Sequence, residues 1–128
     1  MRIIRKIVVH ASGKAGDDYG KIDVRHRRRG LRRIGFHFVI GEDGALVRGR
    51  PLADVGAHCL GYNADSVGVC LCGTGLPTVA QMRKLHGLTC RLRRRFPRAE
   101  LCRAGELDPW LSDPLTLDMN TLRKERPS

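Results

Sequence analysis

Short apolar runs alternate with polar, glycine-rich stretches in the first half of the chain, and this pattern predicts β-strands. Residues 3–9 are rich in β-branched side chains and end in a polar loop, which is typical of a first strand. Residues 36–40 and 45–50 flank a Gly-Glu-Asp-Gly turn, and we expect them to pair as a hairpin. Residues 66–72 alternate small and apolar side chains, which favours a central, buried strand.

Helical periodicity is strongest in residues 78–95, where apolar side chains recur at three- and four-residue steps and form one stripe. Residues 22–29 predict a short basic helix that stops at a glycine, and residues 115–125 predict a final short helix. Residues 100–103 read as a last strand. The order strand, helix, hairpin, strand, helix, strand indicates a single-domain α/β fold, with a central mixed β-sheet flanked by helices.

The length of 128 residues is that of one domain. We assign residues 1–123 to this domain and expect the polar residues 124–128 to form a frayed C-terminal tail. Residues 51–63 lack periodicity and predict a structured loop with a turn of helix.

The charge is strongly basic, with 24 Lys and Arg against 13 Asp and Glu and a formal net charge of +11. Such a field favours polyanionic partners such as nucleic acid or an anionic envelope polymer. No apolar run approaches the ~20 residues that span a bilayer. The N-terminal segment has no signal-peptide cleavage pattern, so we expect the protein to be cytoplasmic as synthesised and to reach a cell wall only after release.

The five cysteines form no Cys-x-x-Cys pair, so the sequence does not predict a cysteine-rich zinc module. Cys70 and Cys72 alternate in a predicted strand and should point to one face. We expect reduced thiols that pack as small buried hydrophobes.

Three parts of the chain carry a family resemblance: residues 7–10, residues 34–44, and residues 56–63 with the strand that follows. Together they resemble the zinc-dependent N-acetylmuramoyl-L-alanine amidases, which include phage lysozymes and peptidoglycan-recognition proteins. The resemblance implies the α/β fold of that family. It also implies a peptidoglycan or muropeptide substrate, whose amide between the muramoyl lactyl group and L-alanine is hydrolysed.

The resemblance also implies a zinc cofactor, whose catalytic form has three protein ligands and one open position. The family's ligands correspond here to His10, Ala104 and Asp113, so two of the three positions keep a donor. His58 is a possible substitute for the missing one. Read without the family, His10 could equally be a packed histidine, and Asp113 before a proline could simply form a turn.

Other catalytic positions of the family also depart from its pattern. Phe36 stands where phage-type members have a tyrosine, and Cys70 stands where other members have a glutamate. Leu111 and Ser112 occupy the place of an oxyanion-stabilising lysine. We therefore expect weak or no hydrolysis by the usual mechanism.

Three residues are candidates for substrate binding: His37, His58 and Asn63. Successive strand residues face opposite sides, so an inward-facing His37 would instead be a hydrogen-bonded structural residue.

Three functions remain open from the sequence. The first is a peptidoglycan amidase with impaired chemistry. The second is a non-catalytic protein that binds peptidoglycan fragments. The third is a regulator that uses its basic surface on nucleic acid or on RNA polymerase, on which phage-type members of the family can also act.

Overall fold

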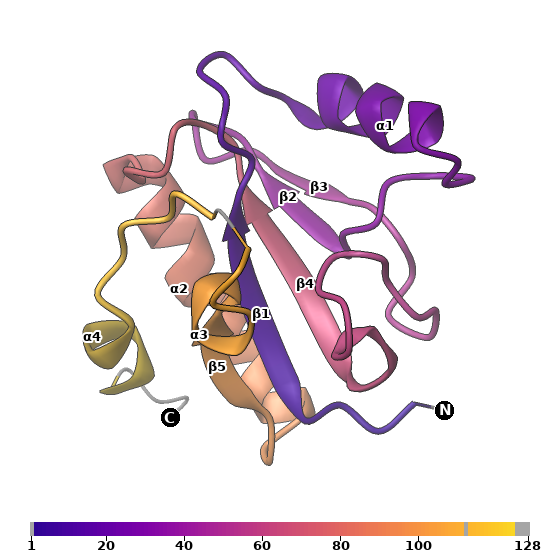
Figure 1. Ribbon diagram of the computed structural model, residues 1–128. Coiled ribbons are helices and arrows are strands. Elements are labelled where there is room, and N and C mark those ends of the chain that lie inside the picture. Colours follow the sequence, from indigo (N-terminus) through magenta and orange to yellow (C-terminus); the bar gives the residue numbers. More distant parts are fainter. Residues whose placement is uncertain (1, 112, 125–128) are drawn as a thin grey trace.

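The computed structural model describes residues 2–111 and 113–124, and its centre is a five-stranded sheet of order β3-β2-β4-β1-β5 (Figure 1). The strands are β1 (Lys6–Ala11), β2 (Phe38–Ile40), β3 (Leu46–Arg48), β4 (Ser66–Leu71) and β5 (Glu100–Arg103). β1 lies between β4 and β5 and is parallel to both, whereas β2 is parallel to β4 and antiparallel to β3. The mixed sheet, the hairpin and the central strand β4 are therefore as predicted.

The helices surround this sheet on both sides. They are α1 (Tyr19–Arg28), α2 (Val79–Arg95), α3 (Ala104–Leu107) and α4 (Met119–Lys124), with a 3-10 turn η1 (Asn63–Asp65). The start of α2 is set by a capping box, because the Thr78 hydroxyl accepts from the Gln81 N–H while the Gln81 side chain accepts from the Thr78 N–H. None of the described helices is long and apolar enough to cross a membrane.

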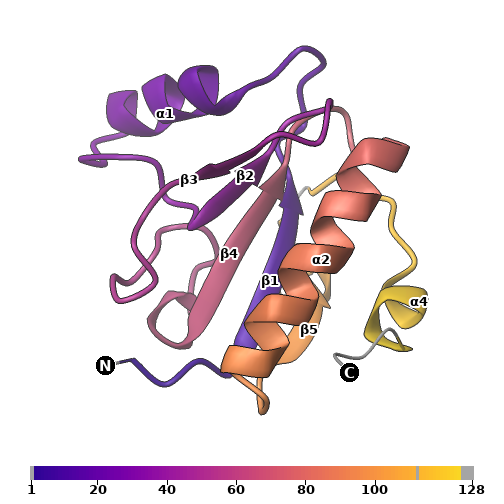
Figure 2. The same cartoon turned by 180° about the vertical axis from the view of Figure 1, so that it is seen from behind.

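The alternation of side chains along the central strands divides the protein into two layers. One face of the sheet packs on α2 and α4, with Leu85, Leu88 and Leu92 against Ile7, Val9, Val67 and Val69. Figure 2 shows α2 lying across this face. The opposite face carries Ser66, Gly68 and Cys70 of β4 together with His10, and it is covered in part by α1. The candidate site lies on this second face.

Some boundaries differ from the sequence prediction. β1 begins at Lys6 and runs on to Ala11, so His10 lies within the strand. The last helix begins at Met119, because residues 113–118 form an extended connection first. Helix α3 was not predicted, since four residues are too few to show a period. Lys124, assigned to the tail, ends α4, and the other four tail residues lie outside the described ranges.

Candidate functional site

A cavity of about 600 Å³ opens above the end of β1, on the face of the sheet opposite α2. Its walls come from residues 10–13, from α1, from the loop 57–63 and from the segment 108–114. Polar and apolar groups share this lining, as is usual for sites that bind small ligands.

His10 is the centre of the cavity wall, and its side chain is 4% exposed. Strand register brings two other candidate positions beside it, since His10 pairs with Cys70 on one side and Val9 pairs with Arg103 on the other. Ala104 directly follows Arg103 and so lies level with His10. The Phe36 ring packs edge-on against the His10 ring at 5.1 Å between centroids. The structure therefore gathers the predicted positions around one histidine.

A chain of hydrogen bonds leads from His10 into the protein. Nε2 of His10 lies 2.9 Å from Nδ1 of His58, and Nε2 of His58 lies 3.1 Å from Oγ of Ser66. Ser66 is fully buried in β4. The His58 ring fits here because Gly68 has no side chain, and a Cβ at Gly68 would stand 2.6 Å from that ring.

Asp113 approaches His10 from the other side of the imidazole. Its Oδ2 lies 3.6 Å from Nδ1 of His10, and both side chains are about 5% exposed or less. The carboxylate also accepts the N–H of Leu115 at 2.9 Å and, over longer distances, the N–H of Ala11. These backbone donors hold the carboxylate in place, although burial raises the pKa of Asp113.

Burial makes both histidines weak bases. Loss of solvation lowers the pKa of His10 to about 4. Loss of solvation, with the nearby positive charge of His10 and other basic groups, lowers the pKa of His58 to about 2. Both rings are therefore neutral near pH 7, and each has one N–H and one lone pair.

The donor set does not fit a catalytic zinc, for which three protein ligands are needed. Among the described residues, His10 Nδ1 and Asp113 Oδ2 face each other, whereas His58 meets the opposite nitrogen of the His10 ring. Within residues 2–111 and 113–124, no group of three His, Cys, Asp or Glu side chains is placed to hold a metal ion. His58 as a substitute for the missing ligand stays a prediction.

The other two predicted substrate-binding residues, His37 and Asn63, support the site through hydrogen bonds to the backbone. His37 is 1% exposed and is placed under the cavity, where Nδ1 accepts the N–H of Gly68 at 3.0 Å and Nε2 donates to the carbonyl of Asp54 at 2.8 Å. His37 thus faces inward and is hydrogen-bonded through both ring nitrogens, which is the alternative to substrate binding that the sequence left open. Asn63 lines the cavity, and its Oδ1 accepts the N–H groups of His58 and Cys59, both at 2.9 Å. Asn63 thus holds the loop that carries His58.

The predicted catalytic positions supply no acid or base. Phe36 has no hydroxyl, and burial raises the pKa of the Cys70 thiol well above its usual value, so that Cys70 stays protonated. Leu111 lines the cavity with an apolar side chain, and Ser112 lies outside the described residues.

Several lining residues were not predicted as site residues from the sequence: Arg25 of α1, Arg29 directly after α1, and Leu60 and Asp108 of the rim. Arg25 is held by a bidentate pair with buried Asp17, at 2.8 and 2.6 Å. The side chain of Arg29 is exposed and faces the cavity. The arginine run in α1 was the available signal, but a sequence does not show which of its members face inward.

Comparison with known proteins places this chain in a family. The profile of the N-acetylmuramoyl-L-alanine amidase family matches residues 1–106. The chain belongs to that amidase family. It is 38% identical over 115 residues to the endolysin of Klebsiella phage KP32, which covers 81% of this chain and 76% of that protein. Amidases of this family are generally zinc-dependent.

Solved amidase structures share the fold. The N-acetylmuramoyl-L-alanine amidase LysC from Clostridium intestinale superposes with a TM-score of 0.89 at 29% identity, over 97% of this chain and 85% of that one. A Drosophila PGRP-LB variant in complex with tracheal cytotoxin gives a TM-score of 0.77 at 25% identity, over 90% of this chain and 77% of that one. The fold of this amidase-family protein is therefore one shared with solved amidase structures.

Proposed function

We propose that this protein binds muropeptides of the cell wall in the cavity above β1 and hydrolyses them poorly or not at all. One observation carries the proposal: the cavity is present, but within residues 2–111 and 113–124 the pair of His10 and Asp113 has no third side chain placed to hold a metal ion with it. The cavity that would bind the substrate is thus present, whereas the set of metal ligands is incomplete. The cell wall is reached after release, as for a protein that acts outside the compartment of its synthesis.

The chemistry of the lining supports loss of hydrolysis. Amide cleavage needs a group that moves a proton at the reacting centre, and a missing one usually lowers the rate by about 10²–10⁴-fold. Phe36 and Cys70 stand beside His10 and cannot do this near pH 7. A missing oxyanion donor lowers the rate by a further ~10²–10³-fold, and Leu111 offers no such donor. The donor set of the described residues likewise does not fit a zinc with three protein ligands.

The same lining supports binding of a peptide stem. The α1 wall presents the exposed cation Arg29, and the opposite rim presents Asp108 and the apolar Leu60, which is 88% exposed. A stem peptide carries carboxylates, amide groups and small apolar side chains, so it offers a partner for each. Charge-assisted contacts such as carboxylate to arginine are the stronger ones in this set.

The test compares two neighbouring arginines. Arg29 lines the cavity and Arg28 does not, although both are exposed at the end of α1. Calorimetric titration with an N-acetylmuramoyl tripeptide should give affinity about tenfold weaker for Arg29→Ala, the loss of one exposed ionic contact of ~1.4 kcal/mol. Arg28→Ala should bind like the wild type. No measurable binding by the wild type, or equal losses in both variants, would overturn the proposal.

A further inference from the structure

The outer face of α2 carries a continuous set of cations on the side of the molecule opposite the cavity. Lys84, Arg91 and Arg95 follow one another at seven- and four-residue steps, so they share one face of the helix. Arg83 and Arg94 flank them on the same outer surface. Figure 2 shows this helix in front of the sheet, far from α1.

These cations are exposed and have no acidic partner. The helix contains no Asp or Glu, and no ion pair within the described part of the chain involves Arg83, Lys84, Arg91, Arg94 or Arg95. In α1, by contrast, Arg25 and Arg27 are paired with Asp17 and Asp23. Arg95 lies over the Phe96 ring, but no ion pair among the described residues offsets the repulsion within this set, which points to an external anion.

A hollow lies in the middle of this face. Arg83, Lys84 and Arg91 line it together with Gly87 and the hairpin turn 43–45. Gly87 leaves it open, because a Cβ built there would meet no atom within 4 Å. Asp43 is the one acidic residue of the lining, and its Oδ1 already accepts the N–H of Ala45. An anionic group of phosphate size can thus enter between cationic side chains.

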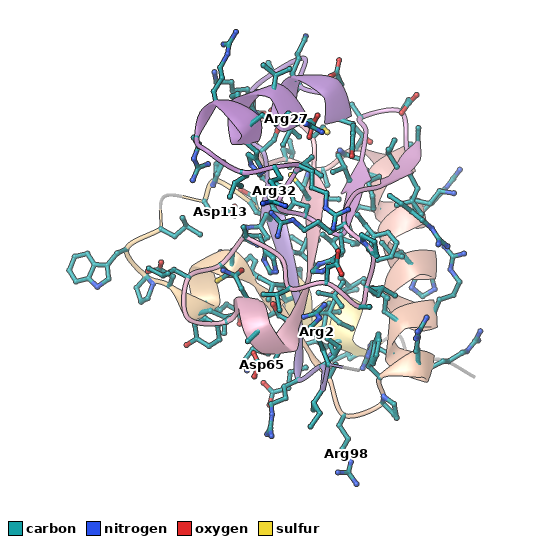
Figure 3. The ribbon with its side chains drawn as sticks, turned by 90° about the vertical axis from the view of Figure 1, so that its right-hand side faces the viewer. Arg2, Arg27, Arg32, Asp65, Arg98 and Asp113 are labelled. Carbon is teal, nitrogen blue, oxygen red and sulfur yellow. The ribbon has the colours of Figure 1, made fainter. Side chains whose placement is uncertain are left out.

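Arg98 extends the line of cations past the end of α2, and Figure 3 shows its side chain pointing away from the body of the molecule. The rise of an α-helix is ~1.5 Å per residue, so the cations from Arg83 to Arg98 follow a path of roughly 20 Å. Such a row matches a linear polymer with repeated negative charge. It does not match a single small anion.

We propose that the outer face of α2 binds a linear phosphodiester polymer of the cell envelope. Arginine predominates in the row, and its guanidinium pairs with phosphate oxygens in a bidentate manner. Leu85, Leu88 and Leu92 of α2 are buried against the sheet, and Val79 is the one large apolar side chain of α2 that is exposed, which is too little for insertion into a lipid layer. Phe96 is half-buried with Arg95 over its ring, and His86 is the one exposed ring of α2, so this face offers no row of aromatic rings for stacking on successive nucleic-acid bases.

The choice of an envelope polymer rests on the proposed function, because a muropeptide-binding protein works where such polymers lie beside peptidoglycan. The cavity and the α2 face are on opposite sides of the sheet, so both ligands can be bound at once. Simultaneous binding at the cavity and at the α2 face then gives a higher overall affinity for the cell wall than either site gives alone.

The test measures retention on immobilised polyglycerol phosphate. Lys84→Glu with Arg91→Glu should weaken binding by about tenfold or more, and the slope against salt concentration should become shallower, because fewer counterions are released. The matched control Arg28→Glu with Arg32→Glu changes net charge equally on another surface and should weaken binding by about threefold at most. Gly87→Glu places one anion in the hollow without a steric conflict and should weaken binding as well.

Several outcomes would overturn this inference. Equal losses in both double variants would assign binding to the overall charge. Tighter binding of a duplex DNA of similar charge density, sensitive to the same substitutions, would assign the face to nucleic acid. Muropeptide titration of the Lys84→Glu, Arg91→Glu variant keeps the two proposals apart, because its cavity is unchanged and its muropeptide affinity should equal that of the wild type.

Discussion

His10 and His58 meet through a hydrogen bond of 2.9 Å between Nε2 of His10 and Nδ1 of His58. This contact places His58 behind His10 as seen from Asp113, which faces Nδ1 of His10. In this geometry His58 is placed to orient the His10 ring from the side away from Asp113. In metal sites, a partner of this kind supports a ligand from behind.

The packing of His58 on Gly68 gives a first prediction. Gly68→Ala should lower the free energy of unfolding by about 1–3 kcal/mol, because the new methyl group would overlap the buried imidazole. His58→Ala should also destabilise, yet the double variant should be more stable than the sum of the two losses predicts. Urea unfolding of the four proteins measures this coupling. If the losses of unfolding free energy in the two single variants simply add in the double variant, the methyl group at position 68 does not clash with the His58 ring.

The buried histidines give a second prediction, for pH. The folded-state pKa of His10, about 4, is below its unfolded value, so the folded protein binds fewer protons between these values. The resulting stability is complete above about pH 6.5 and is lost as pH falls through 4, on the order of 3 kcal/mol at ~1.4 kcal/mol per pKa unit. His58 adds to this loss in the same direction over the wider range from about pH 6.5 to about 2, because its folded-state pKa is lower still.

The control for this pH effect is His10→Gln, which cannot titrate. Its stability between pH 6.5 and 4 should fall less steeply than that of the wild type, as measured by urea unfolding at fixed pH values. Parallel slopes for the two proteins would mean that His10 is not the group responsible.

Arg2 gives a third prediction, about the loop that carries His58 and Asn63. Its guanidinium donates to the carbonyls of Leu52 at 2.7 Å and Ser66 at 2.9 Å, and Figure 3 shows it near the turn at Asp65. Arg2→Gln should destabilise the protein by about 1–3 kcal/mol and speed amide hydrogen exchange in residues 52–66. Arg5→Gln, which removes only a long, exposed ion pair, should leave both nearly unchanged.

The missing donor gives a fourth prediction. Ala104 is fully buried and level with His10, so Ala104→His should add a third donor beside His10 and Asp113 at a cost of about 1–3 kcal/mol of stability. Zinc bound per protein, measured after dialysis, should rise towards one. Ala104→Leu adds similar bulk without a donor and should bind no more zinc than the wild type. Equal zinc contents in the two variants would remove the case for Ala104 as the vacant ligand position.

Gly87 gives a fifth prediction, which bears on α2 alone. Glycine within a helix costs roughly 0.5–1 kcal/mol relative to alanine, and a Cβ here meets open space. Gly87→Ala should therefore raise the free energy of unfolding by up to about 1 kcal/mol. A decrease would mean that this glycine is needed for the helix itself.

Much of the fold was predictable from local patterns. The apolar stripe of α2 and the buried run of β4 each have one strong period, and the hairpin turn is marked by its glycines. The short helix α3 and the start of α4 were not predictable, because so few residues carry no period of their own. These boundaries depend on what the segment packs against.

The site was predictable as a set of residues but not as a geometry. The family resemblance identified His10, Ala104 and Asp113, and strand register does bring the first two level. Which nitrogen of His10 faces which partner is set by side-chain torsions and by the space above Gly68, and neither is visible in a sequence. That detail decides the role of His58, and it also shows His37 to be buried beneath the cavity.

The central claim is that binding has been kept while zinc-dependent hydrolysis has been reduced. It is tested most directly by titrating the wild-type protein with an N-acetylmuramoyl tripeptide, first with EDTA and then with added zinc, while released stem peptide is measured by chromatography. The account predicts the same Kd in both conditions and release no faster than in protein-free buffer. Binding that disappears with EDTA, together with zinc-dependent release of the stem peptide, would contradict it.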